Sequence, residues 1–199
     1  EKLGKNAEAL HWTEQAHARL HRLEGAEAAR EAARAGAWYA ELLHAEGRTS
    51  EAIECAERTV LEAEAVEDAA ALANAYFVMA EAYGELGKEG AELLMQRSLE
   101  AYQRSGNVEK QVDVLSKIGT VCQWEGHWDE ALSYHKQARE AAQTVGGTVN
   151  AAISSIYIGQ ILIDRGEWTE AEALLAETLP LLRASQYRYY FAHCLVQFG

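Results

Sequence analysis

The sequence contains a single proline, three phenylalanines and three cysteines among its 199 residues. Proline interrupts helices because it lacks the backbone donor and clashes with the preceding turn, so its scarcity leaves room for long helices. Alanine and leucine, which are strong helix formers, are abundant instead. The composition therefore predicts an all-α protein and argues against a β-sandwich.

Basic residues are also few, because 18 Lys and Arg stand against 31 Asp and Glu and the formal net charge is −13. Such a surface repels phosphate backbones and anionic lipid headgroups, which makes nucleic acid and membranes poor partners. The sequence has no uncharged apolar run of about 18 residues, and Glu1 to Lys5 lack the apolar stretch of a signal peptide. We expect a soluble, cytoplasmic protein.

The three cysteines, Cys55, Cys122 and Cys194, lie far apart without a CxxC pair. Their odd number and wide spacing make a disulfide framework unfavourable, so we expect buried free thiols in a reducing compartment. The chain also lacks an initiator Met, and we expect its ends to lie within a longer protein.

Four similar segments recur along the chain. They begin at Gly47, Gly87, Gly126 and Gly166, which are 40, 39 and 40 residues apart, and each soon reaches an alanine, at Ala52, Ala91, Ala131 and Ala171. A fainter fifth copy covers residues 4–9, and we expect the array to begin before residue 1. This period predicts a repeat architecture.

Each repeat carries the 3.6-residue periodicity of two helices. Seven residues before each clear glycine is a small residue between bulky ones, namely Ala40, Ala80, Gly119 and Gly159, which predicts a first helix, helix A. Positions four and seven after each alanine define a second helix, helix B; they are Ala56 and Thr59, Met95 and Ser98, His135 and Ala138, and Leu175 and Thr178. The glycine suits the left-handed residue that closes helix A.

We expect helices at residues 6–23, 27–46, 49–65, 68–86, 88–104, 108–125, 128–144, 148–165, 168–184 and 187–199. The whole chain, 1–199, is predicted to be one repeat array. It divides into a partial repeat 1–25, full repeats 26–66, 67–106, 107–146 and 147–186, and a truncated repeat 187–199.

The small residue in helix A, the glycine turn and the alanine in helix B resemble the tetratricopeptide repeat, in a variant longer than the usual period of about 34 residues. The runs at 117–120, 124–134, 158–166 and 185–189 are similar to the C-terminal arrays of bacterial proteins that carry a class III adenylate or guanylate cyclase and a large ATPase module, and to related signal-transduction ATPases. The resemblance implies a right-handed superhelix of about ten antiparallel helices, without catalysis or cofactor. The sequence also has no GxxxxGK[ST] or GxGxxG phosphate-binding motif.

In this family the helix A surfaces line a concave groove that binds partners. Carried over by their offsets from the small residue, the groove positions are Arg34, Glu41, His44, Asn74, Phe77, Glu81, Glu85, Asp113, Thr120, Gln123, Trp124, Gln160 and Asp164, with an apolar end near Ile153, Ile156 and Ile163. The carboxylates outnumber Arg34 and favour a basic or amphipathic protein or peptide. The alternative is that they reflect only the acidic composition of the chain.

These features predict an interaction scaffold that regulates a catalytic module elsewhere in a bacterial signalling protein. A small-molecule sensor that uses the groove as a ligand pocket is the alternative from another class. A homodimer through exposed terminal repeats is a third possibility, because residues 187–191 begin another helix A and Gly199 falls at its small-residue position.

Several residues could carry chemistry but favour a structural role. His17 and His21, with Glu14 and Glu24 nearby, have metal-ligand spacing, yet no HExxH or CxxC accompanies them, so an exposed polar face is favoured and no metal site is predicted. A cysteine and a histidine that are near in sequence could form a nucleophile and a base. Such pairs are Cys55 with His44, and Cys122 with His127 or His135, but buried structural thiols are favoured over catalysis. Packing around the glycine turns, rather than an aromatic cage, is expected of Trp124, Trp128 and Trp168.

Overall fold

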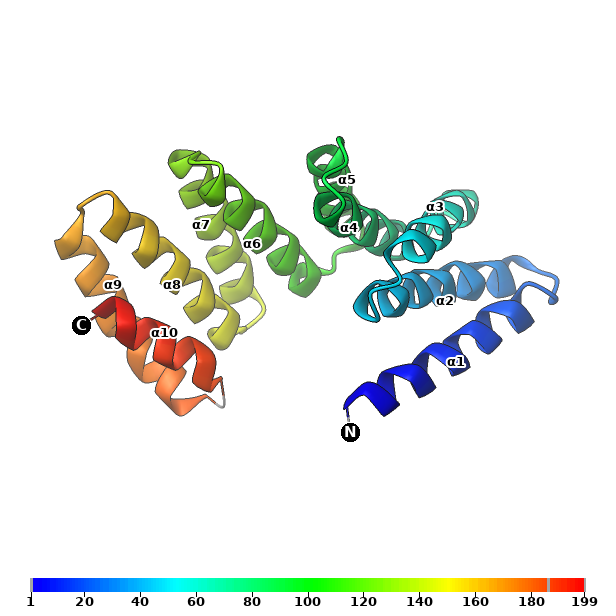
Figure 1. Ribbon diagram of the computed structural model, residues 1–199, viewed down its shortest axis with the longest axis horizontal. Helices are drawn as coiled ribbons and strands as arrows, with labels where there is room; N and C mark the ends of the chain where they lie inside the picture. Colours follow the sequence, from blue (N-terminus) through cyan, green and yellow to red (C-terminus); the bar gives the residue numbers. More distant parts are fainter. Residues whose placement is uncertain (1, 186, 199) are drawn as a thin grey trace. The chain divides into compact units, whose positions relative to one another are not determined.

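The computed structural model of the protein describes residues 2–185 and 187–198, with side chains for 8–185 and 187–197. These residues form ten helices and no strand, which confirms the all-α fold (Figure 1). The helices are α1 (Lys2–Leu20), α2 (Ala26–Ala45), α3 (Thr49–Ala65), α4 (Ala69–Glu85), α5 (Ala91–Ser105), α6 (Val108–Trp124), α7 (Trp128–Thr144), α8 (Thr148–Asp164), α9 (Trp168–Ala184) and α10 (Arg188–Phe198).

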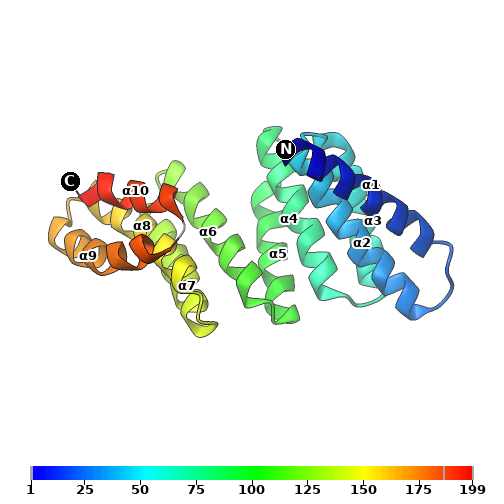
Figure 2. The ribbon, with the colours of Figure 1, turned by 90° about the horizontal axis from the view of Figure 1, so that it is seen from below.

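The chain divides into two compact units, residues 1–107 with α1 to α5 and residues 108–199 with α6 to α10. Within each unit, consecutive helices pack side by side as antiparallel pairs (Figure 2). Helix A of one repeat also contacts helix A of the next, α2 with α4 in the first unit, and α6 with α8 and α8 with α10 in the second. Each unit is therefore a stack of helix hairpins in which successive helix A elements are neighbours.

The turn from helix A to helix B is built in the same way in all four clear repeats. Its glycine has a positive φ of 75° at Gly47, 61° at Gly87, 83° at Gly126 and 78° at Gly166. The residue after the glycine donates its N–H back to the helix A carbonyl five residues earlier, for example His127 to Cys122 at 2.8 Å. This left-handed closure satisfies carbonyls at the helix end and explains the glycine period of the sequence.

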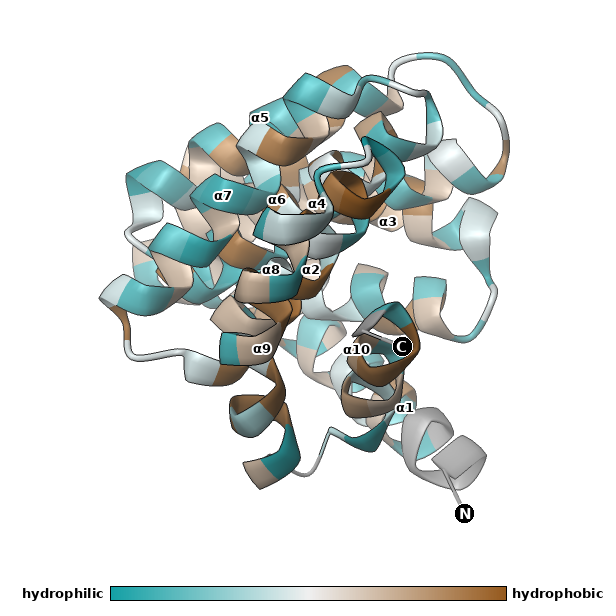
Figure 3. Ribbon diagram, turned by 90° about the vertical axis from the view of Figure 1, so that its left-hand side faces the viewer, coloured by the Kyte–Doolittle hydropathy of each residue, from teal (hydrophilic) through white to brown (hydrophobic). Residues whose placement is uncertain are grey.

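Small residues line the interior of both units, so the helices approach closely. Most buried positions of α2 and α3 are alanines, including Ala33, Ala40 and Ala52, all with no exposed surface. In the second unit a Cβ added to Gly119 would lie 2.9 Å from the His135 ring, and one added to Gly159 would lie 2.8 Å from Leu175. Figure 3 shows hydrophobic residues, in brown, along α10, which packs on α8 and α9.

The observed helices agree with the expected ones except at the start of the chain and before α5. Helix α1 begins at Lys2, so Gly4 of the faint fifth copy lies within a helix and not in a turn. Helix α5 begins at Ala91 rather than residue 88, because Gly90 takes a left-handed conformation just before it. Gly199 lies outside the described residues. Among the helices that the structure describes, none has both the length and the apolar character required to cross a bilayer.

Candidate functional site

Seven of the predicted groove residues lie on α2 and α4 of the first unit, and polar contacts join four of them. The Asn74 amide donates to the Glu41 carboxylate at 3.0 Å, and His44 Nε2 lies 3.1 Å from the Glu85 carboxylate. These two contacts tie the helix A surfaces of neighbouring repeats together. We call the surface formed by Arg34, Glu41, His44, Asn74, Phe77, Glu81 and Glu85 the α2–α4 face.

Arg34 is the only arginine or lysine among the residues of this face, and its charge is engaged by acids. Its guanidinium donates to Asp68 and to Glu31, both at 2.7 Å, and these hydrogen bonds raise its pKa above the usual range. Asp68 is buried, and its second oxygen accepts the Ala71 N–H at the start of α4. The α2–α4 face is acidic as a result, with Glu41 and Glu81 half-buried and Glu85 exposed.

The remaining predicted groove residues lie in the second unit, with Asp113, Thr120, Gln123 and Trp124 on α6 and Gln160 and Asp164 on α8. We call this set the α6–α8 face. The Gln160 amide donates to Asp164 at 3.1 Å, and the Gln160 oxygen accepts from Gln197 of α10 at 2.8 Å.

The apolar end predicted for the groove is wrong at Ile156, which has no exposed surface and packs in the core with Leu175 and Leu182. Ile153 and Ile163 are half-buried. The expected packing of tryptophans against the turns is met only in part at Trp128 and Trp168, whose indole nitrogens lie 3.9 and 3.7 Å from where a Cβ on the turn glycine would be, while the residues are 36% and 64% exposed. It is wrong at Trp124, which is 82% exposed.

Two open hollows are lined by residues other than those of the α2–α4 face. One, of about 530 Å³, is lined by α3, α4 and α5 and carries Glu64, Arg97, Glu100 and Arg104. The other, of about 470 Å³, surrounds the start of α7 and the end of α8 and includes Asp164 and Arg165. Charged walls of this kind differ from the mostly apolar lining of ligand pockets.

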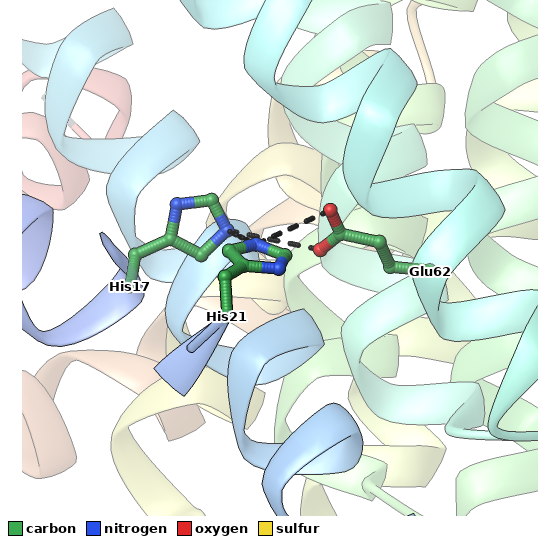
Figure 4. Close-up of side chains that lie close together, drawn as sticks. All are labelled: His17, His21 and Glu62. Atoms are coloured by element: carbon green, nitrogen blue, oxygen red, sulfur yellow. Dashed lines mark hydrogen bonds and ion pairs between the residues drawn. The ribbon is translucent and has the colours of Figure 1, made fainter. Parts of the chain in front are cut away.

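His17, His21 and Glu62 converge between α1 and α3 (Figure 4). The two Nε2 atoms are 2.9 Å apart, and the Glu62 carboxylate lies 3.4 Å from His21 and 3.7 Å from His17. The carboxylate therefore comes from α3, 41 residues beyond His21, and the cluster includes neither Glu14 nor Glu24. The prediction of an exposed polar face is wrong at His17, which is only 7% exposed.

Helix packing explains how His17 reaches this position. Gly36 of α2 has no side chain, and a Cβ there would lie 3.1 Å from His17 Nε2 and 2.6 Å from Thr59 Oγ1. Burial, and then the neighbouring His21, lower the pKa of His17 and favour the neutral imidazole. No local sequence signal marks Glu62 as a member of the cluster, because its approach to the histidines depends on the packing of segments that are 41 residues apart in the chain.

The buried thiols and His135 show no catalytic arrangement. All three cysteines are buried thiols, as expected, and Cys55 donates weakly to the Gly36 carbonyl at 3.5 Å. Burial raises the pKa of Cys55, which opposes formation of a thiolate. His135 has no exposed surface and stacks on Tyr157 at 4.9 Å. Neither of its ring nitrogens has a hydrogen-bond partner among the described residues.

Comparison with known proteins identifies related folds. Residues 111–184 match the Tetratricopeptide repeat family. BtubC (BKLC) from P. vanneervenii is similar in structure, with a TM-score of 0.76 and 21% identity over 92% of this chain and 75% of that one. No curated protein sequence matches the chain.

Two further solved structures have the same fold. A Signal Transduction ATPase with Numerous Domains from Pyrococcus horikoshii, which has a tetratricopeptide repeat sensor, gives a TM-score of 0.74 at 15% identity over 85% of this chain but only 27% of that one. The TPR-like repeats of a putative kinesin light chain from Podosopora anserina give 0.65 at 18% identity, over 93% and 90%. At these identities the likeness establishes the fold alone.

Proposed function

We propose that this chain, whose residues 111–184 match the Tetratricopeptide repeat family, is a non-catalytic protein-interaction module of a larger regulatory protein, and that its α2–α4 face binds a basic or amphipathic segment of a partner. The observation that carries the proposal is the acidic character of this face. Glu41, Glu81 and Glu85 lie on it, while the charge of Arg34 is engaged by Asp68 and Glu31.

The chemistry of the face suits a peptide ligand with alternating features. Glutamates in the C-terminal halves of α2 and α4 attract Lys or Arg side chains, and the half-buried Phe77, one turn before Glu81, offers an apolar contact. Acidic surfaces also speed the encounter with a basic ligand, and salt weakens that effect. A basic amphipathic segment therefore matches the charge of this face and its apolar residue Phe77.

The α6–α8 face offers a second interaction surface in the other unit. Trp124, 82% exposed, is an unusual residue to present to water, and aromatic side chains are enriched at the centres of protein interfaces. Asp113 and Asp164 supply the acidic charge there. We propose the same class of partner for this face.

The test is a binding measurement with two short synthetic peptides, one amphipathic and Lys-rich and the other its Glu-substituted counterpart, by fluorescence anisotropy at low and high salt. The Lys-rich peptide is expected to bind the full chain and to lose affinity in the Glu41→Lys, Glu81→Lys, Glu85→Lys triple variant. The matched control is the triple charge reversal at Glu54, Glu57 and Glu92, which are exposed on helix B surfaces of the same unit. Equal losses of peptide affinity in both variants would reject the α2–α4 face as the binding site and would attribute binding to the overall negative charge of the chain.

Association between copies of the chain is a second candidate function, favoured by the surface of α10. Helix α10 is rich in apolar and aromatic residues, and two of them are largely exposed, Tyr189 at 73% and Val196 at 79%. Light scattering after size exclusion would detect a dimer, and Val196→Glu with Tyr189→Glu would dissociate it if α10 forms the interface.

A further inference from the structure

We propose that His17, His21 and Glu62 form a binding site for a divalent transition-metal ion, for which zinc is the best-matched probe. Two imidazole nitrogens and one carboxylate make a ligand set typical of zinc sites that keep a further position for water. The same set of two histidines and one carboxylate also holds other first-row divalent metals. This proposal rests on the first unit alone and is independent of partner binding to the α2–α4 face.

The distances between the ligand atoms fit one central ion. Zinc lies about 2.0 Å from its nitrogen and oxygen ligands, so the ligands of a tetrahedral site are separated by roughly 3.3 Å. The corresponding separations are 2.9 Å between the two Nε2 atoms, 3.4 Å from His21 to Glu62 and 3.7 Å from His17 to Glu62. Shifts of a few tenths of an ångström in these side chains would centre an ion between them.

The cluster has more acceptors than donors when both imidazoles are neutral. A single N–H on one Nε2 can satisfy the other Nε2, which leaves the Glu62 carboxylate without that donor. Glu62 Oε2 is in fact buried and has no hydrogen-bond partner among the described residues. A cation would satisfy both nitrogens and the carboxylate at once, because each contributes a lone pair.

The site combines a fixed ligand with an accessible one. His17 is buried and packed against Gly36 and Thr59, so its Nε2 position is set by the core. The His21 side chain is 42% exposed, which leaves a path for an ion and for a water ligand. Arg58, one turn before Glu62, places a positive charge near His17, and the negative charge of Glu62 opposes it with the larger effect.

An ion at this position would join α1 to α3. His21 and Glu62 are 41 residues apart in the chain, and binding to the folded protein alone raises the free energy of unfolding. The expected effect is therefore a zinc-dependent stabilisation of the first unit.

The test is zinc titration of the full chain, stripped of metal with a chelator, by isothermal titration calorimetry and by thermal unfolding. We expect one zinc equivalent to bind and the melting temperature to rise. Loss of a positioning group around a metal ligand typically weakens affinity about 10- to 100-fold, and loss of a ligand in His21→Gln or Glu62→Gln is expected to cost at least as much. The thermal shift should disappear in both variants.

His11→Gln and Glu57→Gln are the matched controls, because they remove the same groups from exposed positions of α1 and α3. Both should bind zinc as the unaltered chain does. His21 is half-exposed, so His21→Gln keeps the test valid if the buried His17→Gln fails to fold. Absence of saturable zinc binding, or unchanged affinity in His21→Gln, would overturn the proposal.

Discussion

The two units use the same repeat but treat a buried histidine differently. In the first unit His17 meets His21 and Glu62, so its ring nitrogen faces polar groups. In the second unit His135 lies between Gly119 and Tyr157, and its ring nitrogens find no hydrogen-bond partner among the described residues. In both units a glycine of helix A leaves room for a histidine from a neighbouring helix. The residues around that histidine determine whether its ring nitrogens face polar or apolar groups.

The repeat positions make this comparison specific. His135 corresponds to Ala56, Met95 and Leu175 in the other repeats, and Leu175 fills the gap at Gly159 as His135 fills the gap at Gly119. An apolar side chain is therefore sufficient for packing at this position. The imidazole adds two buried nitrogens, and an unsatisfied buried polar group typically costs about 1–3 kcal/mol.

The largest effect is expected from pH acting on His135. Burial lowers the pKa of His135 to about 4 in the folded chain, whereas the pKa of a histidine in the unfolded chain is about 6.5. Between these values the unfolded state binds more protons, so the free energy of unfolding falls as the pH drops from about 6.5 to about 4, by on the order of 3 kcal/mol. Urea unfolding at a series of pH values measures this loss.

His135→Met is the control, chosen because Met95 occupies the equivalent position of another repeat. Other titrating groups contribute equally to both proteins, so the difference between their unfolding free energies isolates His135. Between about pH 6.5 and about pH 4, the free energy of unfolding of the variant is expected to fall less than that of the unaltered chain. Parallel curves for the two proteins would contradict the assignment.

A smaller effect is expected from filling the gap beside His135. The Cβ of Gly119→Ala would lie 2.9 Å from two ring atoms, and the ring is held by stacking on Tyr157. Overpacking typically costs about 1–3 kcal/mol, which exceeds the gain of about 1 kcal/mol in helix propensity.

Gly84→Ala in α4 is the matched control, since its Cβ would meet nothing within 4 Å. It gains the propensity without a clash, so the two alanine variants should differ by about 2 kcal/mol in thermal or chemical unfolding. Equal stability would show that the His135 ring moves freely, and would weaken the comparison between the two histidines.

The periodicity of the sequence was sufficient to predict the fold, because the buried residues of each helix recur with the helical period of about 3.6 residues within that segment. The glycine turns predict the boundaries of seven helices, α2 to α4 and α6 to α9, to within one residue. The start of α5 was missed because two loop residues and Gly90 precede it, and helix propensity alone does not exclude Lys88 and Glu89 from a helix. Gly4 was misread because a glycine inside a helix looks like a turn signal.

The candidate sites were less predictable because they depend on contacts between helices. The spacing of His17 and His21 indicated one helix face, but the carboxylate that joins them comes from α3 and has no local signal. The groove offsets correctly assigned Glu41 and Asn74 to one surface, where they form a hydrogen bond. The same offsets predicted an exposed Ile156, but the structure buries this residue against Leu175. Offsets identify a face, and burial depends on what packs over it.

The smallest effect concerns the ion pairs that link neighbouring repeats. Asp68 is buried, caps α4 and binds Arg34, whereas Asp129 is 94% exposed and binds Arg165 in the second unit. Asp68→Ala should lose about 1 kcal/mol through the cap, while Asp129→Ala should stay within about 0.5 kcal/mol of the unaltered chain. Asp68→Asn, which keeps the cap acceptor, should recover most of the loss in urea unfolding. Equal costs for the two alanine variants would mean that burial of the carboxylate does not separate the two pairs.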